Sequence, residues 1–240
     1  MSKEQTICDL KKPKPHLCQL NPGLRWFLIL SLALAAFTVS AATNRFEGSI
    51  RAFERSDKTN SPPQGAVLFV GSSTIRKWTT LAKDFPKHKV INRGFGGSMY
   101  SDCDYYFDRI VTPYKPKVIV LYAGSNDLSG GKKPAQVEAD CVEFFDKVKA
   151  ALPETKIAIV SINAPPSRWK DLAKIKEVNK HLEDYAASHT NITYLDVFTP
   201  LLDKDDQPQR DLYLSDRLHP NAKGYAIWTK VVAPYLDRVD

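Results

Sequence analysis

The sequence has no dense run of lysine and arginine, although its formal net charge is +7. Five of its 34 basic and two of its 27 acidic residues lie in residues 1–42, which leaves 29 basic and 25 acidic residues for the rest. This small excess of positive charge is spread along the chain. It excludes the basic surface that nucleic-acid-binding proteins present, so we expect no nucleic-acid partner.

The sequence also has few cysteines, and no two of the four have the spacing of metal ligands. Cys8 and Cys18 precede an uncharged apolar segment, whereas Cys103 and Cys141 fall in segments with a helical pattern. We expect the latter two to be free buried thiols and claim no disulfide between them. Histidines and carboxylates do not cluster, and there is no internal repeat or low-complexity tract. We therefore expect no metal and no cofactor.

Residues 26–42 contain no charged side chain, follow the basic segment 1–25 and end in Ser40-Ala41-Ala42. This layout is typical of a secretory signal peptide cleaved after Ala42. The long polar front favours instead an uncleaved membrane anchor with its basic end in the cytoplasm, although 17 residues are short for a span. Both alternatives predict export: a periplasmic or otherwise extracytoplasmic protein, secreted or membrane-anchored. Residues 43–240 then suffice for one domain with a sizeable core.

Short apolar runs alternate with helical patterns throughout this domain. The predicted strands are 66–70, 88–92, 117–123, 156–162 and 191–197. The predicted helices are 44–58, 98–111, 134–152, 168–188 and 221–237. Valine- and isoleucine-rich strands between helices indicate a parallel sheet covered on both faces. The sequence therefore predicts an α/β protein, a three-layer α/β/α sandwich with a five-stranded parallel sheet.

Polar and glycine-rich segments follow four of these strands. They are Gly71–Ser73, Arg93–Ser98, Gly124–Asp127 and, after the fifth strand, Asp216–His219. Ligands bind outside the carboxyl ends of the strands in sheets of this type, so we expect these segments to meet at one edge. Each segment also has a purely structural interpretation, as a helix cap, a turn or a surface loop. Because all four segments fall at the same edge of the sheet, a catalytic role is favoured over these structural alternatives.

The residue types at this edge are those of nucleophilic catalysis. A serine hydroxyl needs a histidine to accept its proton, and the histidine needs a carboxylate to fix its tautomer. Asp216 and His219 are three residues apart, close enough for one turn to bring their side chains together. A backbone N–H at Gly97 and the side-chain amide of Asn126 are suited to stabilise an oxyanion.

Four blocks of sequence in and around these segments resemble those of the SGNH (GDSL-type) hydrolases, in the order of that family. They are Gly71–Ser73, Asn92–Gly97, Gly124–Asp127 and Asp216–His219. The resemblance covers the chain from about residue 45 to its end. It implies a flavodoxin-like SGNH hydrolase fold in which Ser73 is the nucleophile, His219 the base and Asp216 its partner. Gly97, Asn126 and the backbone N–H of Ser73 would form the oxyanion hole. The first block reads Gly-Ser-Ser-Thr-Ile instead of Gly-Asp-Ser-Leu, which is similar to the platelet-activating-factor acetylhydrolases and their bacterial relatives.

We therefore expect a metal-independent serine esterase that forms an acyl-enzyme on Ser73 and possesses no cofactor. Its expected partner is a small-molecule, glycan or lipid ester, with deacetylation of glycans as one candidate reaction. The alternatives are a lysophospholipase- or thioesterase-type lipid acylhydrolase and a membrane-tethered binding module without turnover. Four residues are expected near the edge, where they line a pocket or serve packing: Arg93, Tyr122, Arg168 and Trp169. The sequence does not indicate an oligomeric state.

Overall fold

The computed structural model describes residues 44–240 of the 240-residue chain. The apolar segment 26–42, its cleavage after Ala42, and Cys8 and Cys18 lie outside the described residues. In the part that is described, no helix combines the length and the hydropathy that crossing a membrane requires. Cys103 and Cys141 are both buried and free.

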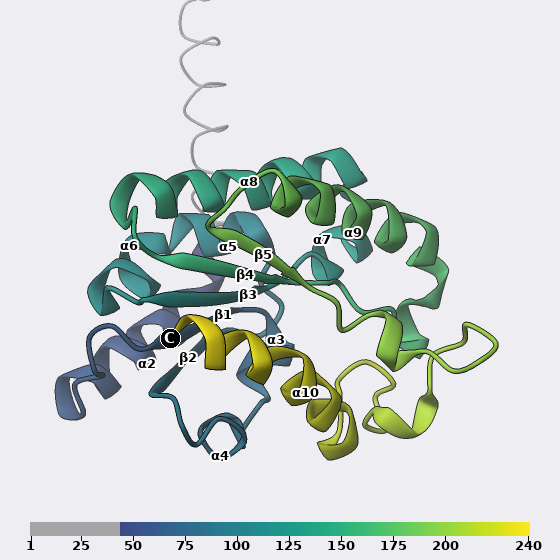
Figure 1. The fold of residues 1–240 in the computed structure, drawn as a ribbon, viewed down its shortest axis with the longest axis horizontal. Helices are drawn as coiled ribbons and strands as arrows, with labels where there is room; N and C mark the ends of the chain where they lie inside the picture. The colour runs from purple at the N-terminus through teal and green to yellow at the C-terminus, as the bar shows by residue number, and fades with distance from the viewer. Residues whose placement is uncertain (1–43) are drawn as a thin grey trace, which may run out of the picture. The chain divides into compact units, whose positions relative to one another are not determined.

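A five-stranded sheet in the order β2-β1-β3-β4-β5 forms the centre of the domain, and every pair in it is parallel (Figure 1). The strands are β1 Val67–Gly71, β2 Val90–Gly94, β3 Val118–Tyr122, β4 Lys156–Val160 and β5 Ile192–Leu195. β1 lies between β2 and β3, with Gly71 aligned with Gly94 on one side and with Tyr122 on the other. The predicted three-layer α/β/α fold is confirmed.

The strands bury side chains on both faces, which is why they read as continuous apolar runs. In β1, Leu68 and Val70 belong to the core on one face, and Val67 and Phe69 to the core on the other. This alternation follows from the two-residue period of a strand. Two separate helical layers therefore seal the sheet.

The first helical layer packs on the face that Leu68 and Val70 reach, and the second on the opposite face (Figure 1). The first comprises α2 Glu47–Thr59, α5 Tyr100–Tyr105, α6 Phe107–Ile110, α8 Pro134–Ala151 and α9 Leu172–Ala187. The second comprises α3 Ser73–Arg76, α4 Leu81–Asp84 and α10 Ala222–Val239. Short segments complete the chain: η1 Asn44–Phe46, η2 Thr112–Tyr114, α7 Ser125–Ser129, η3 Pro166–Asp171, η4 Thr199–Leu201 and η5 Arg210–Leu212.

The single helix predicted over 98–111 is wrong in detail, because the structure divides it into α5 and α6 at Tyr106. Tyrosine, serine, aspartate and cysteine are weak helix formers and dominate this stretch. The buried ring of Tyr106 packs edge-on against Phe95, with 6.1 Å between centroids. Packing therefore decides the backbone here. The helix predicted from 168 similarly begins as the 3₁₀ turn η3, with α9 following from Leu172.

Candidate active site

Ser73 is the first residue of α3, directly beyond the end of β1. Gly71 makes this turn with φ of +141°, and a Cβ at Gly71 would lie 1.8 Å from the carbonyl oxygen of Tyr122. The N–H of Ser72 donates to the same oxygen at 3.0 Å. Only glycine allows the chain to pass this close to β3. The side chain of Ser72 makes no capping bond to α3, so helix capping does not explain this serine pair.

A chain of hydrogen bonds joins Ser73 to a histidine 146 residues further along the sequence. The Oγ of Ser73 lies 2.8 Å from Nε2 of His219, and Nδ1 of His219 lies 2.6 Å from Oδ2 of Asp216. His219 is 8% exposed, so its ring is held within the protein while Ser73 remains half-buried at the surface. The structure thus brings together the three residues singled out as nucleophile, base and carboxylate.

Asp216 is held as a carboxylate by its own loop. Its Oδ1 accepts hydrogen bonds from the backbone N–H groups of Leu218 and His219, each at 3.0 Å. Burial alone would raise the pKa of Asp216, but these bonds and the His219 ring lower it to about 2. The ionised form is the one that fixes the tautomer of a neighbouring imidazole. The ammonium group of Lys77 lies 3.8 Å from Oδ2 of Asp216, in an exposed ion pair that contributes little to stability.

The segment that carries Asp216 and His219 is fixed at both ends. The N–H of Leu214 donates to the carbonyl of His219 at 2.8 Å, which closes a tight loop with Arg217 at a φ of +57°. Asn221 then caps α10 by accepting from the N–H groups of residues 223 and 224. The same side chain donates back to the carbonyl of Asp211 at 2.7 Å. The histidine is therefore placed by a helix start, not by a free loop.

Two further groups reach the same edge of the sheet from the loops after β2 and β3. Gly97 has a φ of +86°, and its N–H donates no hydrogen bond within the described residues. The Nδ2 of Asn126 donates to the carbonyl of Ser98 at 3.0 Å, and the second N–H of this amide has no partner in the described part of the chain. The N–H of Ser73 also lacks a partner within its helix, because Ser73 is the first residue of α3.

Asp127 holds the loop that presents Asn126. It is fully buried, and its carboxylate accepts from the backbone N–H of Gly124 at 3.1 Å and of Tyr100 at 3.3 Å. Burial raises the pKa of Asp127, an effect that its ion pair with Lys132 at 2.9 Å opposes. The cap interpretation of Asp127 is therefore correct, and it ties the β3 loop to α5. In the sequence, this cap is indicated by the position of Asp127 three residues after Gly124.

A family model described as the GDSL-like lipase/acylhydrolase family matches residues 64–227. The chain belongs to this family. As a GDSL-like protein it resembles a multidomain esterase of Ruminococcus flavefaciens, at 28% identity over 142 residues. That match spans 54% of this chain but only 17% of the relative, so the likeness concerns one part of a much longer protein.

Solved structures share the fold of this GDSL-like domain. A protein from Streptococcus pneumonia that is described as a platelet activating factor superposes with a TM-score of 0.71 at 22% identity. The match covers 85% of this chain and 99% of that one. A GDSL-like lipase from Bacteroides thetaiotaomicron gives 0.69 at 21% identity, over 79% and 97%. A carbohydrate esterase of family 3 from Talaromyces cellulolyticus gives 0.60 at 19% identity, over 72% and 96%. These solved structures therefore show the fold of the domain, while the family model shows its membership of the GDSL-like lipase/acylhydrolase family.

The four residues expected near the edge of this GDSL-like domain have different roles. Arg93 is buried in an ion pair with Asp57 and donates to the hydroxyl of Tyr114 at 2.7 Å, so it serves packing. Tyr122 is buried too, with its hydroxyl bonded to the side chain of Asn163. Arg168 and Trp169 are half-buried in η3.

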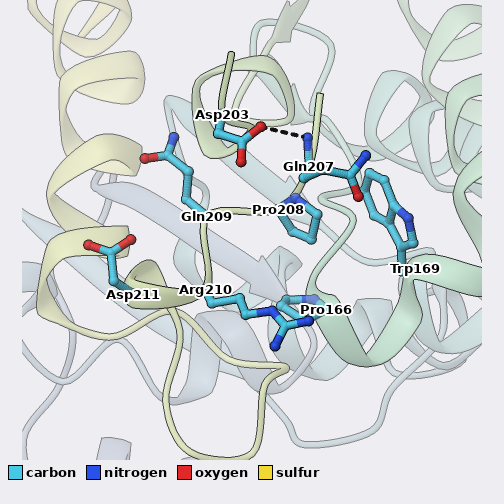
Figure 2. Close-up of a pocket in the computed structure, with 8 residues that line it drawn as sticks. All are labelled: Pro166, Trp169, Asp203, Gln207, Pro208, Gln209, Arg210 and Asp211. Carbon is cyan, nitrogen blue, oxygen red and sulfur yellow. Dashed lines mark hydrogen bonds between the residues drawn. The ribbon is translucent and has the colours of Figure 1, made fainter. Parts of the chain in front are cut away.

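A hollow of about 730 Å³ in the GDSL-like domain is lined by residues other than Ser73, His219 and Asp216. Its walls are Pro166 and Trp169 of η3 together with Asp203 and residues 207–211 (Figure 2). Within residues 44–240, no group of three or more histidine, cysteine, aspartate or glutamate side chains is arranged to hold a metal ion.

Proposed function

We propose that this protein is a serine esterase that hydrolyses carboxylic esters through an acyl-enzyme on Ser73. The observation that carries the proposal is the unbroken chain of hydrogen bonds from the Oγ of Ser73 through His219 to Asp216. A hydroxyl next to an imidazole whose other nitrogen faces a carboxylate is the arrangement that activates serine for attack on an acyl carbon.

In the proposed reaction, Oγ of Ser73 attacks the acyl carbon while Nε2 of His219 accepts the hydroxyl proton. The tetrahedral intermediate collapses when His219 returns this proton to the leaving alcohol, which breaks the ester bond and leaves the acyl group on Ser73. A water molecule then repeats both steps and releases the carboxylic acid. Asp216 stabilises the imidazolium throughout without accepting a proton.

The negative charge on the carbonyl oxygen needs donors that are in place before the reaction. The N–H groups of Ser73 and Gly97 and the free N–H of Asn126 are the proposed oxyanion hole. Because their loops are fixed by Asp127 and by the close contact of β1 with β3, these donors require little reorganisation. Removing one such donor costs about 10²–10³ in kcat in enzymes of this type.

For the substrate we propose acetyl groups on glycans, encountered outside the cytoplasm after export directed by residues 26–42. The likeness of the fold to a carbohydrate esterase and the match to a multidomain esterase support this choice. The alternatives are a lysophospholipid or thioester as substrate, and a membrane-tethered binding module that retains the fold without turnover. Metal-independence is part of the proposal and predicts full activity in EDTA.

The test is hydrolysis of p-nitrophenyl acetate by the full-length chain, its Ser73→Ala variant and its Ser72→Ala variant. We expect Ser73→Ala to lower kcat by about 10⁴-fold or more, since the nucleophile is lost. Ser72→Ala removes the adjacent hydroxyl from the same turn and should retain activity. Equal activity in Ser73→Ala and the unmodified chain would overturn the assignment of the nucleophile. Inactivity of all three towards acetylated glycans, lysolipids and aryl esters would favour the binding module.

A further inference from the structure

The hollow beside η3 has walls that are hydrogen-bonded to the segment carrying Asp216 and His219. The N–H of Ser167, between the lining residues Pro166 and Trp169, donates to the carbonyl of Arg217 at 3.0 Å. At the opposite wall, the carbonyl of Asp211 accepts from the side chain of Asn221, which caps the helix that follows His219. Both bonds therefore connect the walls of the hollow to the residues that flank His219 in the sequence.

The loop that forms the upper wall is held in shape by its own hydrogen bonds. Oδ1 of Asp203 accepts from the N–H groups of Asp205 and Gln207, both at 2.9 Å (the bond to Gln207 is drawn in Figure 2). The side chain of Gln209 donates to the carbonyl of Leu202 at 2.7 Å, and its N–H donates to Leu201 at 3.1 Å. A wall ordered in advance lowers the entropic cost of binding a ligand.

Several side chains of the hollow keep unused hydrogen-bonding capacity. The guanidinium of Arg210 is exposed and makes no hydrogen bond or ion pair with the described part of the chain. The side-chain nitrogen of Gln207 donates to the carbonyl of Asp205 at 3.3 Å, whereas its side-chain oxygen accepts no bond from residues 44–240. Trp169 packs one part of its indole on the core and lines the hollow with the rest, on the side opposite Gln209 and Asp211 (Figure 2).

This combination favours a sugar over a long acyl chain. Burial of an acyl chain is stabilised by continuous apolar surface, yet only Pro166, Trp169 and Pro208 are apolar among the lining residues. A pyranose ring presents C–H groups that pack on an indole and hydroxyls that both donate and accept. Arg210 supplies hydrogen-bond donors, while the side-chain oxygens of Gln207 and Asp203 are acceptors. A sugar hydroxyl, which both donates and accepts, therefore finds both kinds of partner here.

We propose that this hollow is a subsite for the sugar rings of an oligosaccharide whose ester lies at Ser73. The inference rests on the proposed esterase function and specifies its substrate: the acyl group occupies the Ser73 side and the carbohydrate alcohol extends along Trp169 and the 203–211 loop. The subsite then selects the glycan, while the chemistry stays with Ser73, His219 and Asp216.

Binding is measured first without turnover, by calorimetry on the full-length Ser73→Ala protein with xylotetraose, cellotetraose and chitotetraose. We expect at least one of them to bind, and Arg210→Ala on this background to weaken that binding about tenfold, as removal of a charged donor does. Gln207→Ala should weaken it about threefold to tenfold. The matched control is Lys204→Ala, on the same loop but outside the hollow, where the lysine pairs with Asp205 and with no other residue of 44–240. No binding by any of the three, or equal binding by all variants, would overturn the subsite.

Turnover by the protein with Ser73 intact supplies the second readout, on the O-acetylated form of the oligosaccharide that binds. Arg210→Ala should lower kcat/KM about tenfold through KM and leave p-nitrophenyl acetate kinetics unchanged, because that ester carries no sugar. An equal loss on both esters contradicts a subsite, and hydrolysis of a lysophospholipid that depends on Arg210 contradicts the sugar assignment. Esterase activity that survives Ser73→Ala would refute the proposed function alone, since the calorimetric comparison does not depend on it.

Discussion

The sharpest consequence of the geometry concerns Asp216→Asn. One oxygen of Asp216 accepts from two backbone N–H groups, so the amide oxygen of asparagine must take that place. The amide NH₂ is then directed at Nδ1 of His219, where the carboxylate lies 2.6 Å away in the native chain. Two donors cannot face each other, and the proton of the neutral imidazole moves to Nε2. Nε2 then points a proton at Oγ of Ser73 and cannot accept one.

We expect kcat for p-nitrophenyl acetate to fall by about 10⁴, the loss that a wrong histidine tautomer causes in serine hydrolases, with KM and melting temperature nearly unchanged. Steady-state kinetics on the full-length chain measure this loss. Asp205→Asn is the control, because among the residues that the structure describes this exposed carboxylate pairs with Lys204 alone. Retention of more than about a tenth of kcat would refute the reasoning. Since the pKa of Asp216 is about 2, the acidic limb of the wild-type pH profile must belong to another group.

Three other substitutions test separate parts of the structure. Gly71→Ala should unfold the domain or lower its stability by about 3 kcal/mol or more in urea denaturation, because its Cβ meets the Tyr122 carbonyl; unchanged stability would contradict the close approach of the two strands. Asn126→Ala should reduce kcat about 10²–10³-fold at unchanged KM, and a purely structural role would instead show as a lowered melting temperature. Burial raises the pKa of Asp104 to about 8, more than Lys147 lowers it, so the folded state binds the proton more tightly than the unfolded chain. Stability should therefore fall by at most about 1.4 kcal/mol per pH unit from about pH 4 to 8, and Asp104→Asn should flatten this slope in pH-dependent denaturation.

Local sequence patterns were enough to predict the layers of the fold and the pairing of Asp216 with His219 in the site. Strand-forming apolar runs separated by amphipathic segments have few ways to bury both faces of a sheet, and the parallel α/β/α sandwich is the one observed. The pairing of Asp216 with His219 is also local, since three residues and one tight loop bring the two side chains to 2.6 Å. Gly71 belongs here as well, because a strand followed at once by a sharp turn needs a residue without a Cβ.

Tertiary packing alone decided the contacts between distant segments. The 2.8 Å bond between Ser73 and His219 spans 146 residues and depends on how α10 lies against the β1–α3 turn. Arg93 follows a predicted strand at the edge where the site was expected, yet the fold buries its side chain in an ion pair with Asp57. The hollow between Trp169 and the 203–211 loop has no sequence motif at all. Interactions between residues close in the sequence restrict the backbone conformation of each segment. The distance between two segments that are far apart in the sequence depends instead on how all the layers between them pack.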